Sequence, residues 1–276
     1  MLSDTSYFIN SFYVRLLGLV DGSVSPNKPK VILLHGLLGN GQNWVPLARA
    51  LEEKFTILLM DQRGHGKTKP VSGDFLPEDF SSDLLGVVDE LGWEKFNLLG
   101  HSLGARTAFD FASRFPKRLE KVIFEDMGPH KTSEESKKTE AMINFVPVPF
   151  ASRTDAKSFF ANVFLPKYGK ALSDYIYTNI EKKENGSFDW RFDKVGAVRC
   201  LEIGHKNDYW TEFVRVATPN LIIRGERSEH LPLKVYKEML TRNTNSSGVE
   251  IPGAGHWVHF DQFGDFVTQV DKFLSE

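Results

Sequence analysis

Four short apolar runs constrain the fold of this chain more than any other feature. They lie at residues 31–34, 55–60, 96–100 and 121–126. Each run is apolar on both faces, which is typical of strands in a parallel sheet that helices cover on each side. Between two of them, segment 77–91 has apolar residues at helical spacing, with Pro77 early and Gly92 just past its end. We therefore predict an α/β fold with a mostly parallel central sheet flanked by helices.

The pattern changes after Asp126. From about 128 to 215 the chain shows helical patterns and no strand run that would continue the sheet. These patterns lie at 133–145, 154–163, 170–182 and 196–205. The sheet pattern then resumes at 220–225, followed by a helix at 232–241, a strand at 247–251 and a helix near 262–274. The sequence thus predicts a core made of 1–127 and 216–276, an inserted helical cap at 128–215, and an antiparallel entry to the sheet at 7–17.

Composition excludes several classes of protein. The chain has 276 residues with 34 Lys+Arg against 36 Asp+Glu, so no basic surface for nucleic acid is expected. Its single cysteine, Cys200, excludes an intramolecular disulfide and any zinc site with two thiolates. No stretch approaches 18 uncharged apolar residues, and the first residues lack a run of signal-peptide length. We expect a cytoplasmic monomer or homodimer without stable membrane insertion.

Residues 100–104 read Gly-His-Ser-Leu-Gly and supply the candidate nucleophile, Ser102. They follow a strand run and open a helical stretch, which is the setting of a nucleophile elbow. The turn is sharp, and side chains at the two glycine positions would collide with the neighbouring strand and helix. The serine oxygen would then stand at a helix N-terminus, where backbone N–H groups favour negative charge.

A serine hydroxyl needs a base, and His256 is the candidate. It lies in a glycine-rich loop, Pro-Gly-Ala-Gly-His-Trp, between the last strand and the last helix. In a parallel sheet, sites assemble at the edge where such loops lie. His35, His65 and His101 are in tight glycine turns, where we expect them to hold loops by hydrogen bonds. The neighbouring His259 and Asp261 could suggest a metal, but no fourth ligand accompanies them, so none is expected.

An oxyanion hole needs two backbone donors aimed at the reacting oxygen. We predict that one is the N–H of Leu103, directly after the nucleophile. The other is expected in the loop 35–39, His-Gly-Leu-Leu-Gly, where Gly36 lets the backbone fold closely and the Leu37 N–H is the candidate.

These motifs together resemble the α/β-hydrolase superfamily. HGLLG at 35–39, DQRGHGKT at 61–68, GHSLG at 100–104 and GAGHWVH at 253–259 occur in the usual order for that superfamily. The DWRF segment at 189–192 is similar to the small bacterial YbfF-type esterases, which are also similar to a group of mitochondrial hydrolases. The resemblance implies an α/β-hydrolase fold, a helical cap between the sixth and seventh strands, a Ser-His-acid site, no cofactor, and ester or thioester hydrolysis.

The position of the triad acid departs from the usual pattern. The superfamily commonly has G-x-x-D after the seventh strand, but here Ser228 stands where the aspartate would be. Asp126, at the end of the sixth strand, is one substitute, and the YbfF-type group implies it. Glu226 and Glu229 are the alternatives. We favour Asp126 because the apolar run before it fixes its direction, whereas the glutamates have longer side chains in a polar loop.

We therefore expect a serine carboxylesterase that forms an acyl-enzyme on Ser102. Aromatic and aliphatic residues of the insertion would cover a pocket for short- to medium-chain acyl esters, the expected small-molecule partner. Four alternatives stay open, because selectivity depends on the pocket rather than on the triad. They are an acyl-CoA thioesterase, a carbon–carbon bond hydrolase, a perhydrolase, and a ligand-sensing protein with slow hydrolysis.

Overall fold

A computed structural model describes residues 2–130 and 132–276. Its main sheet has eight strands in the order β1-β2-β4-β3-β5-β6-β9-β10. Their bounds are β1 Leu2–Ile9, β2 Phe12–Val20, β3 Lys30–Leu34, β4 Thr56–Met60, β5 Phe96–His101, β6 Leu119–Glu125, β9 Asn220–Gly225 and β10 Ser246–Ile251. β1 pairs antiparallel with β2, β2 pairs antiparallel with β4, and the remaining pairs are parallel. The predicted mostly parallel sheet and its antiparallel entry are confirmed.

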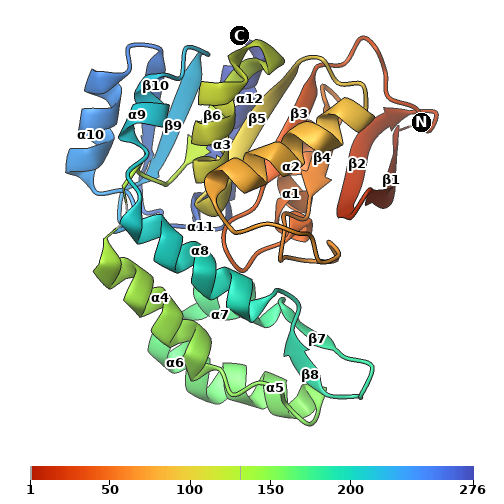
Figure 1. Cartoon of the computed structure of the whole chain (residues 1–276), viewed down its shortest axis with the longest axis vertical. Helices are drawn as coiled ribbons and strands as arrows, with labels where there is room; N and C mark the ends of the chain where they lie inside the picture. The colour runs from red at the N-terminus through yellow and green to blue at the C-terminus, as the bar shows by residue number, and fades with distance from the viewer. Residues whose placement is uncertain (1, 131) are drawn as a thin grey trace.

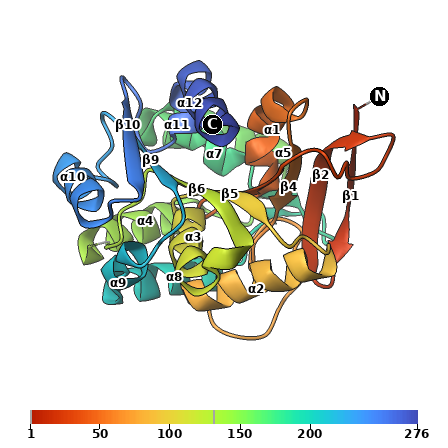
Figure 2. The same cartoon turned by 90° about the horizontal axis from the view of Figure 1, so that it is seen from above.

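Helices cover the sheet on both faces, as the doubly apolar strands require. Figure 2 shows α2, α3 and α9 on one face and α1 and α12 on the other. The helices of the core, on both faces together, are α1 Val45–Leu51, α2 Pro77–Glu90, α3 Leu103–Arg114, α9 Trp210–Val214, α10 Leu233–Arg242, α11 Val258–Asp261 and α12 Phe263–Ser275. The core also has the 3₁₀ turns η1 Gly41–Trp44 and η2 Pro116–Arg118. The rings of Phe109 and Phe124 pack with their centroids 4.5 Å apart in the buried cluster on the α3 face. Phe266 lies in the cluster of the opposite face.

The segment between β6 and α9 forms a separate group of elements beyond one edge of the sheet (Figure 1). It comprises α4 Ser133–Phe145, α5 Arg153–Phe159, the π-helical turn η3 Phe160–Phe164, α6 Leu165–Tyr168, α7 Lys170–Tyr177, β7 Ile180–Lys182, β8 Phe188–Trp190 and α8 Lys194–Lys206. The buried apolar cluster of these elements includes Met142, Phe160 and Trp190, and it extends to Leu38 of the core. That cluster supports our proposal that this segment is a cap over the core.

Two helix predictions in this segment are corrected. The helix expected at 170–182 ends at Tyr177, and the chain then forms the antiparallel hairpin β7–β8. Its turn contains Gly186 at φ 86°, a conformation that glycine adopts without strain. Strands of three residues are too short to show alternation, so the sequence pattern did not reveal them. The helix expected at 154–163 is α5, which ends at Phe159 and continues as the π-helical turn.

The core and the insertion meet near the second boundary. α9 packs on α3, and Phe213 is fully buried against Phe109 and Phe124. α9 therefore rests on the core although it precedes residue 216.

Among the described residues, none of the helices is both long and apolar enough to cross a bilayer. Because β5, β6 and β9 run parallel, the residues that follow their carboxyl ends meet at one edge of the sheet.

Candidate active site

Ser102 lies in the turn between β5 and α3. Its backbone has φ 53° and ψ −108°, which is strained for a residue with a side chain. Its N–H donates to the Glu125 carbonyl at 3.2 Å. A Cβ on Gly100 would lie 2.2 Å from the Gly104 carbonyl oxygen, and one on Gly104 would lie 2.4 Å from the Leu34 oxygen. The glycines are therefore required by the close approach of strand and helix, as the sequence predicts.

His256 lies in the loop between β10 and α11 and is 9% exposed. Its Nδ1 is 2.9 Å from Asp126 Oδ2, so the imidazole donates from Nδ1 to the carboxylate. This contact fixes the tautomer in which Nε2 carries the lone pair that a general base needs. His101 Nε2 donates to the His256 carbonyl at 3.0 Å, which holds the backbone of the loop. His101 thus does what its tight turn predicts.

Asp126 directly follows β6 and is fully buried, with φ 48°. Its Oδ1 accepts from the Gly225 N–H at 2.9 Å, and its Oδ2 accepts from the Ser228 hydroxyl as well as from His256. Burial raises the pKa of the Asp126 carboxyl, and the hydrogen bonds from Ser228 and Gly225 act in the opposite direction. Three donors thus converge on one buried carboxyl group.

The contact of His256 Nδ1 with a carboxylate is made by Asp126 and by neither of the two alternative acids. Glu226 and Glu229 are both exposed, and Glu226 accepts from the Gly253 N–H at 2.7 Å. Ser228, which stands where the superfamily places its acid, instead donates to Asp126. The structure therefore brings Asp126 to the Nδ1 of His256 and gives the serine a role that the sequence did not reveal.

The loop that carries Leu37 is a tight turn held by buried histidines. The Gly36 carbonyl accepts from the Gly39 N–H at 3.0 Å and from His35 Nδ1 at 2.8 Å. His65 Nε2 accepts from the Leu38 N–H at 3.1 Å. Burial lowers the pKa of His35 to about 4 and that of His65 to about 3, so both rings stay neutral at pH 7. The expectation that these two histidines hold loops is confirmed.

Ser102 and His256 line the same cavity, between the core and the insertion. Its volume is about 370 Å³, near the lower end of ligand-binding cavities. Apolar and aromatic side chains make up most of its wall: Leu37, Leu38, Met142, Tyr168, Leu172, Tyr175, Ile176 and Trp257. Its charged or titratable members besides His256 are Glu135, Lys138, Glu229 and His230. Leu103, the other predicted oxyanion residue, is the first residue of α3, directly after Ser102.

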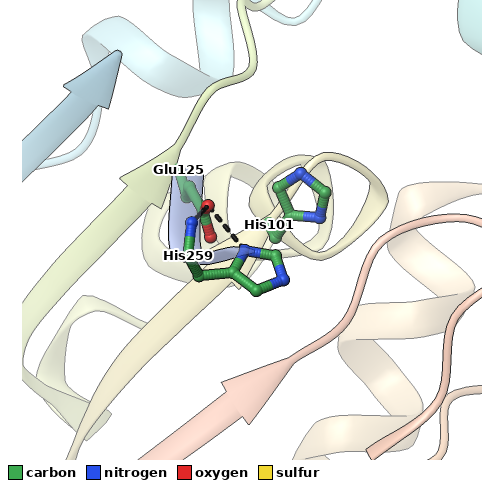
Figure 3. Close-up of side chains that lie close together, drawn as sticks. All are labelled: His101, Glu125 and His259. Atoms are coloured by element: carbon green, nitrogen blue, oxygen red, sulfur yellow. Dashed lines mark hydrogen bonds and ion pairs between the residues drawn. The ribbon is translucent and has the colours of Figure 1, made fainter. Parts of the chain in front are cut away.

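A second histidine–carboxylate pair lies beside this site (Figure 3). Glu125 Oε1 accepts from His259 Nδ1 at 2.7 Å and from the His259 N–H at 3.0 Å. With His101, these residues have metal-binding donor types within 4.8 Å of one another. However, His259 Nδ1 already donates to Glu125, and His101 Nε2 donates to the His256 carbonyl. Burial raises the pKa of Glu125 to about 7. Glu125 Oε2 and His259 Nε2 are buried without a hydrogen-bond partner among the described residues, so hydrogen bonds satisfy this cluster only in part.

Asp261, which the sequence placed near these histidines, accepts from the Gly255 N–H at 2.7 Å and so holds the loop. The sequence analysis did not single out His230, which also lines the cavity. The His230 ring stacks on the His256 ring with centroids 3.8 Å apart. It lies two residues after Ser228, and only the recognition that this loop approaches Asp126 could have revealed it.

Comparisons with known proteins identify the family. The family model described as alpha/beta hydrolase fold matches residues 29–263. An sn-1-specific diacylglycerol lipase of Xenopus laevis is 31% identical over 265 residues, covering 93% of this chain and 82% of that protein.

Solved structures are also similar. A marine microorganism esterase has a TM-score of 0.80 and 27% identity, covering 95% of this chain and 99% of its own. The crystal structure of an E-2-(acetamidomethylene)succinate hydrolase has a TM-score of 0.84 at 21% identity over the full length of both chains, and it shows the shared fold. The closer likeness to YbfF-type esterases stays a prediction. The family match, which covers most of the chain, shows that this protein belongs to the α/β-hydrolase family.

Proposed function

We propose that this protein is a serine carboxylesterase. Ser102 attacks the acyl carbonyl while His256 Nε2 takes the hydroxyl proton, and Asp126 holds the imidazole and stabilises its charged form. The observation that carries the proposal is the contact of His256 Nδ1 with the buried Asp126 carboxylate, in the cavity that the strained Ser102 also lines. That combination has a clear use in nucleophilic catalysis.

The proposed reaction has two halves. In the first, the serine oxygen bonds to the acyl carbon, the carbonyl oxygen becomes an oxyanion, and the backbone N–H groups of Leu37 and Leu103 stabilise it. His256 then returns the proton to the alcohol, which leaves. In the second half, His256 takes a proton from water, the hydroxide attacks the acyl-enzyme, and Ser102 regains its proton as the acid departs.

The substrate proposed for this site is a neutral acyl ester of short to medium chain. The cavity volume of about 370 Å³ favours a small acyl group, and its mostly apolar wall favours a hydrocarbon one. Two carboxylates, Glu135 and Glu229, and one ammonium group, Lys138, also line the cavity. Because like charges repel strongly in a partly enclosed site, this set disfavours an anionic acyl group.

The first experiment is hydrolysis of p-nitrophenyl esters from acetate to palmitate, with acyl-CoAs of matched length. We expect the highest kcat/KM at short to medium chains, and slower turnover of the p-nitrophenyl ester of succinate than of butyrate. Ser102→Ala should abolish turnover and labelling by a fluorophosphonate. Faster turnover of acyl-CoAs than of esters would move the assignment to a thioesterase. Ligand-induced stabilisation with negligible turnover of every ester would favour a sensor.

A further inference from the structure

Tyr175 connects the insertion to the loop that carries the predicted oxyanion donor. It lies on α7, is 5% exposed, and lines the cavity beside Ser102. Its hydroxyl donates to the Leu37 carbonyl at 3.0 Å and lies 3.4 Å from the Gly36 carbonyl. Its ring is 5.5 Å from Trp257, the residue after His256. The phenol therefore contacts the backbone on which the oxyanion hole depends.

The peptide that Tyr175 contacts is anchored at both ends. Its carbonyl, that of Leu37, accepts from the phenol, and its N–H, that of Leu38, donates to His65 in the core. The preceding peptide has the Leu37 N–H at one end and the Gly36 carbonyl at the other, and the Gly36 carbonyl is held by Gly39 and His35. The phenol contacts both peptides, because its hydroxyl also lies 3.4 Å from the Gly36 carbonyl, and the rigid peptide of that carbonyl carries the Leu37 N–H.

A second contact joins the same loop to the insertion. Asn40 Nδ2 donates to Asn179 Oδ1 at 2.9 Å, and both side chains are buried. Asn179 also donates to the Tyr175 carbonyl at 3.0 Å. The segment 175–179 thus holds the loop 36–40 at two points. The core histidines supply the other anchors of this loop.

We propose that Tyr175 is a positioning residue that makes the oxyanion hole dependent on the docked insertion. Its hydroxyl contacts the carbonyls of Gly36 and Leu37, and by holding these two peptides it aims the Leu37 N–H at the reacting oxygen. This inference rests on the proposed esterase function. It predicts that loss of one phenolic oxygen weakens transition-state stabilisation while ground-state binding stays, since the aromatic ring continues to line the cavity.

The test is Tyr175→Phe in the full chain. We expect kcat for p-nitrophenyl butyrate to fall roughly tenfold with KM within about twofold, because a misaimed donor costs less than a missing one. The inhibition constant of a trifluoromethyl ketone, which forms a tetrahedral adduct, should rise by a similar factor. Amide hydrogen exchange at Leu38 and Gly39 should become faster. Tyr177→Phe is the matched control, because that ring lies on the same helix and packs against Phe160.

The outcomes separate the two proposals. A kcat within twofold of wild type, or unchanged exchange at Leu38 and Gly39, would overturn the role of Tyr175. If wild-type protein hydrolyses no ester and is not labelled by a fluorophosphonate, the esterase function fails instead. In that case the exchange comparison still decides whether the phenol holds the loop, and the proposed link to an oxyanion is withdrawn.

Discussion

Two histidine–carboxylate pairs stand side by side in this molecule and differ in what surrounds them. Asp126 and Glu125 are successive residues at the end of β6, and their partners His256 and His259 are three residues apart. The nitrogen–oxygen distances are 2.9 and 2.7 Å. His256 faces the cavity with Ser102, whereas His259 packs against the Trp44 ring at 4.5 Å. The first pair is the one for which we propose a catalytic role, and the second has no access to the cavity that Ser102 lines.

The comparison teaches that access decides function more than composition does. Glu125 and His259 are 0% and 4% exposed, and burial lowers the pKa of His259 to about 3. A base in that environment stays neutral and meets no substrate. Their contact instead ties α11 to the sheet, so that β6 holds both sides of the loop that carries His256.

The largest contrast is expected from Asp126→Asn. This change replaces the carboxylate with a neutral amide and so removes the charge that stabilises the imidazolium. We therefore expect kcat to fall about 10⁴-fold. Glu125→Gln, the matched change in the other pair, should keep kcat within about tenfold, because it touches no reacting group. Ester hydrolysis by both variants measures this. Equal losses of kcat would show that the two pairs act as one unit.

Glu125 is expected to contribute to stability rather than to catalysis. Glu125→Ala leaves the buried His259 Nδ1–H and N–H without their acceptor, which costs about 3 kcal/mol. By the usual scaling for a chain of this size, Tm should fall by roughly 6–12 °C. Denaturant unfolding with thermal scans measures the loss. An unchanged Tm would mean that the pair contributes nothing to the fold.

A smaller effect is expected at Ser228. Ser228→Ala removes one of the three donors to Asp126 while the Gly225 N–H and His256 remain. A hydrogen bond to a charged group is worth about 1.5–3 kcal/mol, part of which appears in catalysis, so we expect kcat to fall about tenfold. In the pH–rate profile, the limb that reports ionisation of the proposed active site should move to a different pH. A serine with a purely structural role would not cause this shift. Wild-type kcat and an unmoved profile would contradict this role.

The smallest expected effect concerns how the free energy of unfolding depends on pH. Burial lowers the pKa of four histidines below 6.5: His35, His65, His101 and His259. As the pH falls, these four histidines bind protons in the unfolded chain before they do so in the folded chain. Their contribution to the free energy of unfolding is therefore complete above pH 6.5 and is lost as the pH falls towards 4. Glu125 and Asp126 have raised pKa values and oppose this loss, because on acidification they take up their protons at a higher pH in the folded chain than in the unfolded chain.

Four groups against two give a net loss of stability on acidification. Each net proton corresponds to about 1.4 kcal/mol per pH unit. Urea midpoints measured between pH 6.5 and 4.5 should therefore decrease steadily. In Glu125→Gln, which lacks one opposing carboxyl group, the decrease should be steeper. A midpoint that rises as the pH falls from 6.5 to 4.5 would contradict the neutral state of the buried histidines.

Much of the fold could be read from the sequence because its signals are local. Doubly apolar runs predict parallel strands, and the glycines at 100 and 104 predict the elbow at Ser102. The β7–β8 hairpin was missed because three-residue strands carry no period. The interactions of Ser228, His230 and Tyr175 were missed because each depends on a partner far along the chain. Long-range packing, which no local pattern encodes, brings them together.

The contact between the ends of β6 and β9 has a consequence for how such enzymes diverge. The Ser228 hydroxyl touches the carboxylate of Asp126, so the two side chains occupy one shared socket beneath the imidazole. A pair of point changes that exchanges them would carry the acid from one strand to its neighbour while the base stays still. The strand that bears the acid is then a weak criterion for how closely two such enzymes are related, because the site beneath the imidazole can be kept while the residues that occupy it change.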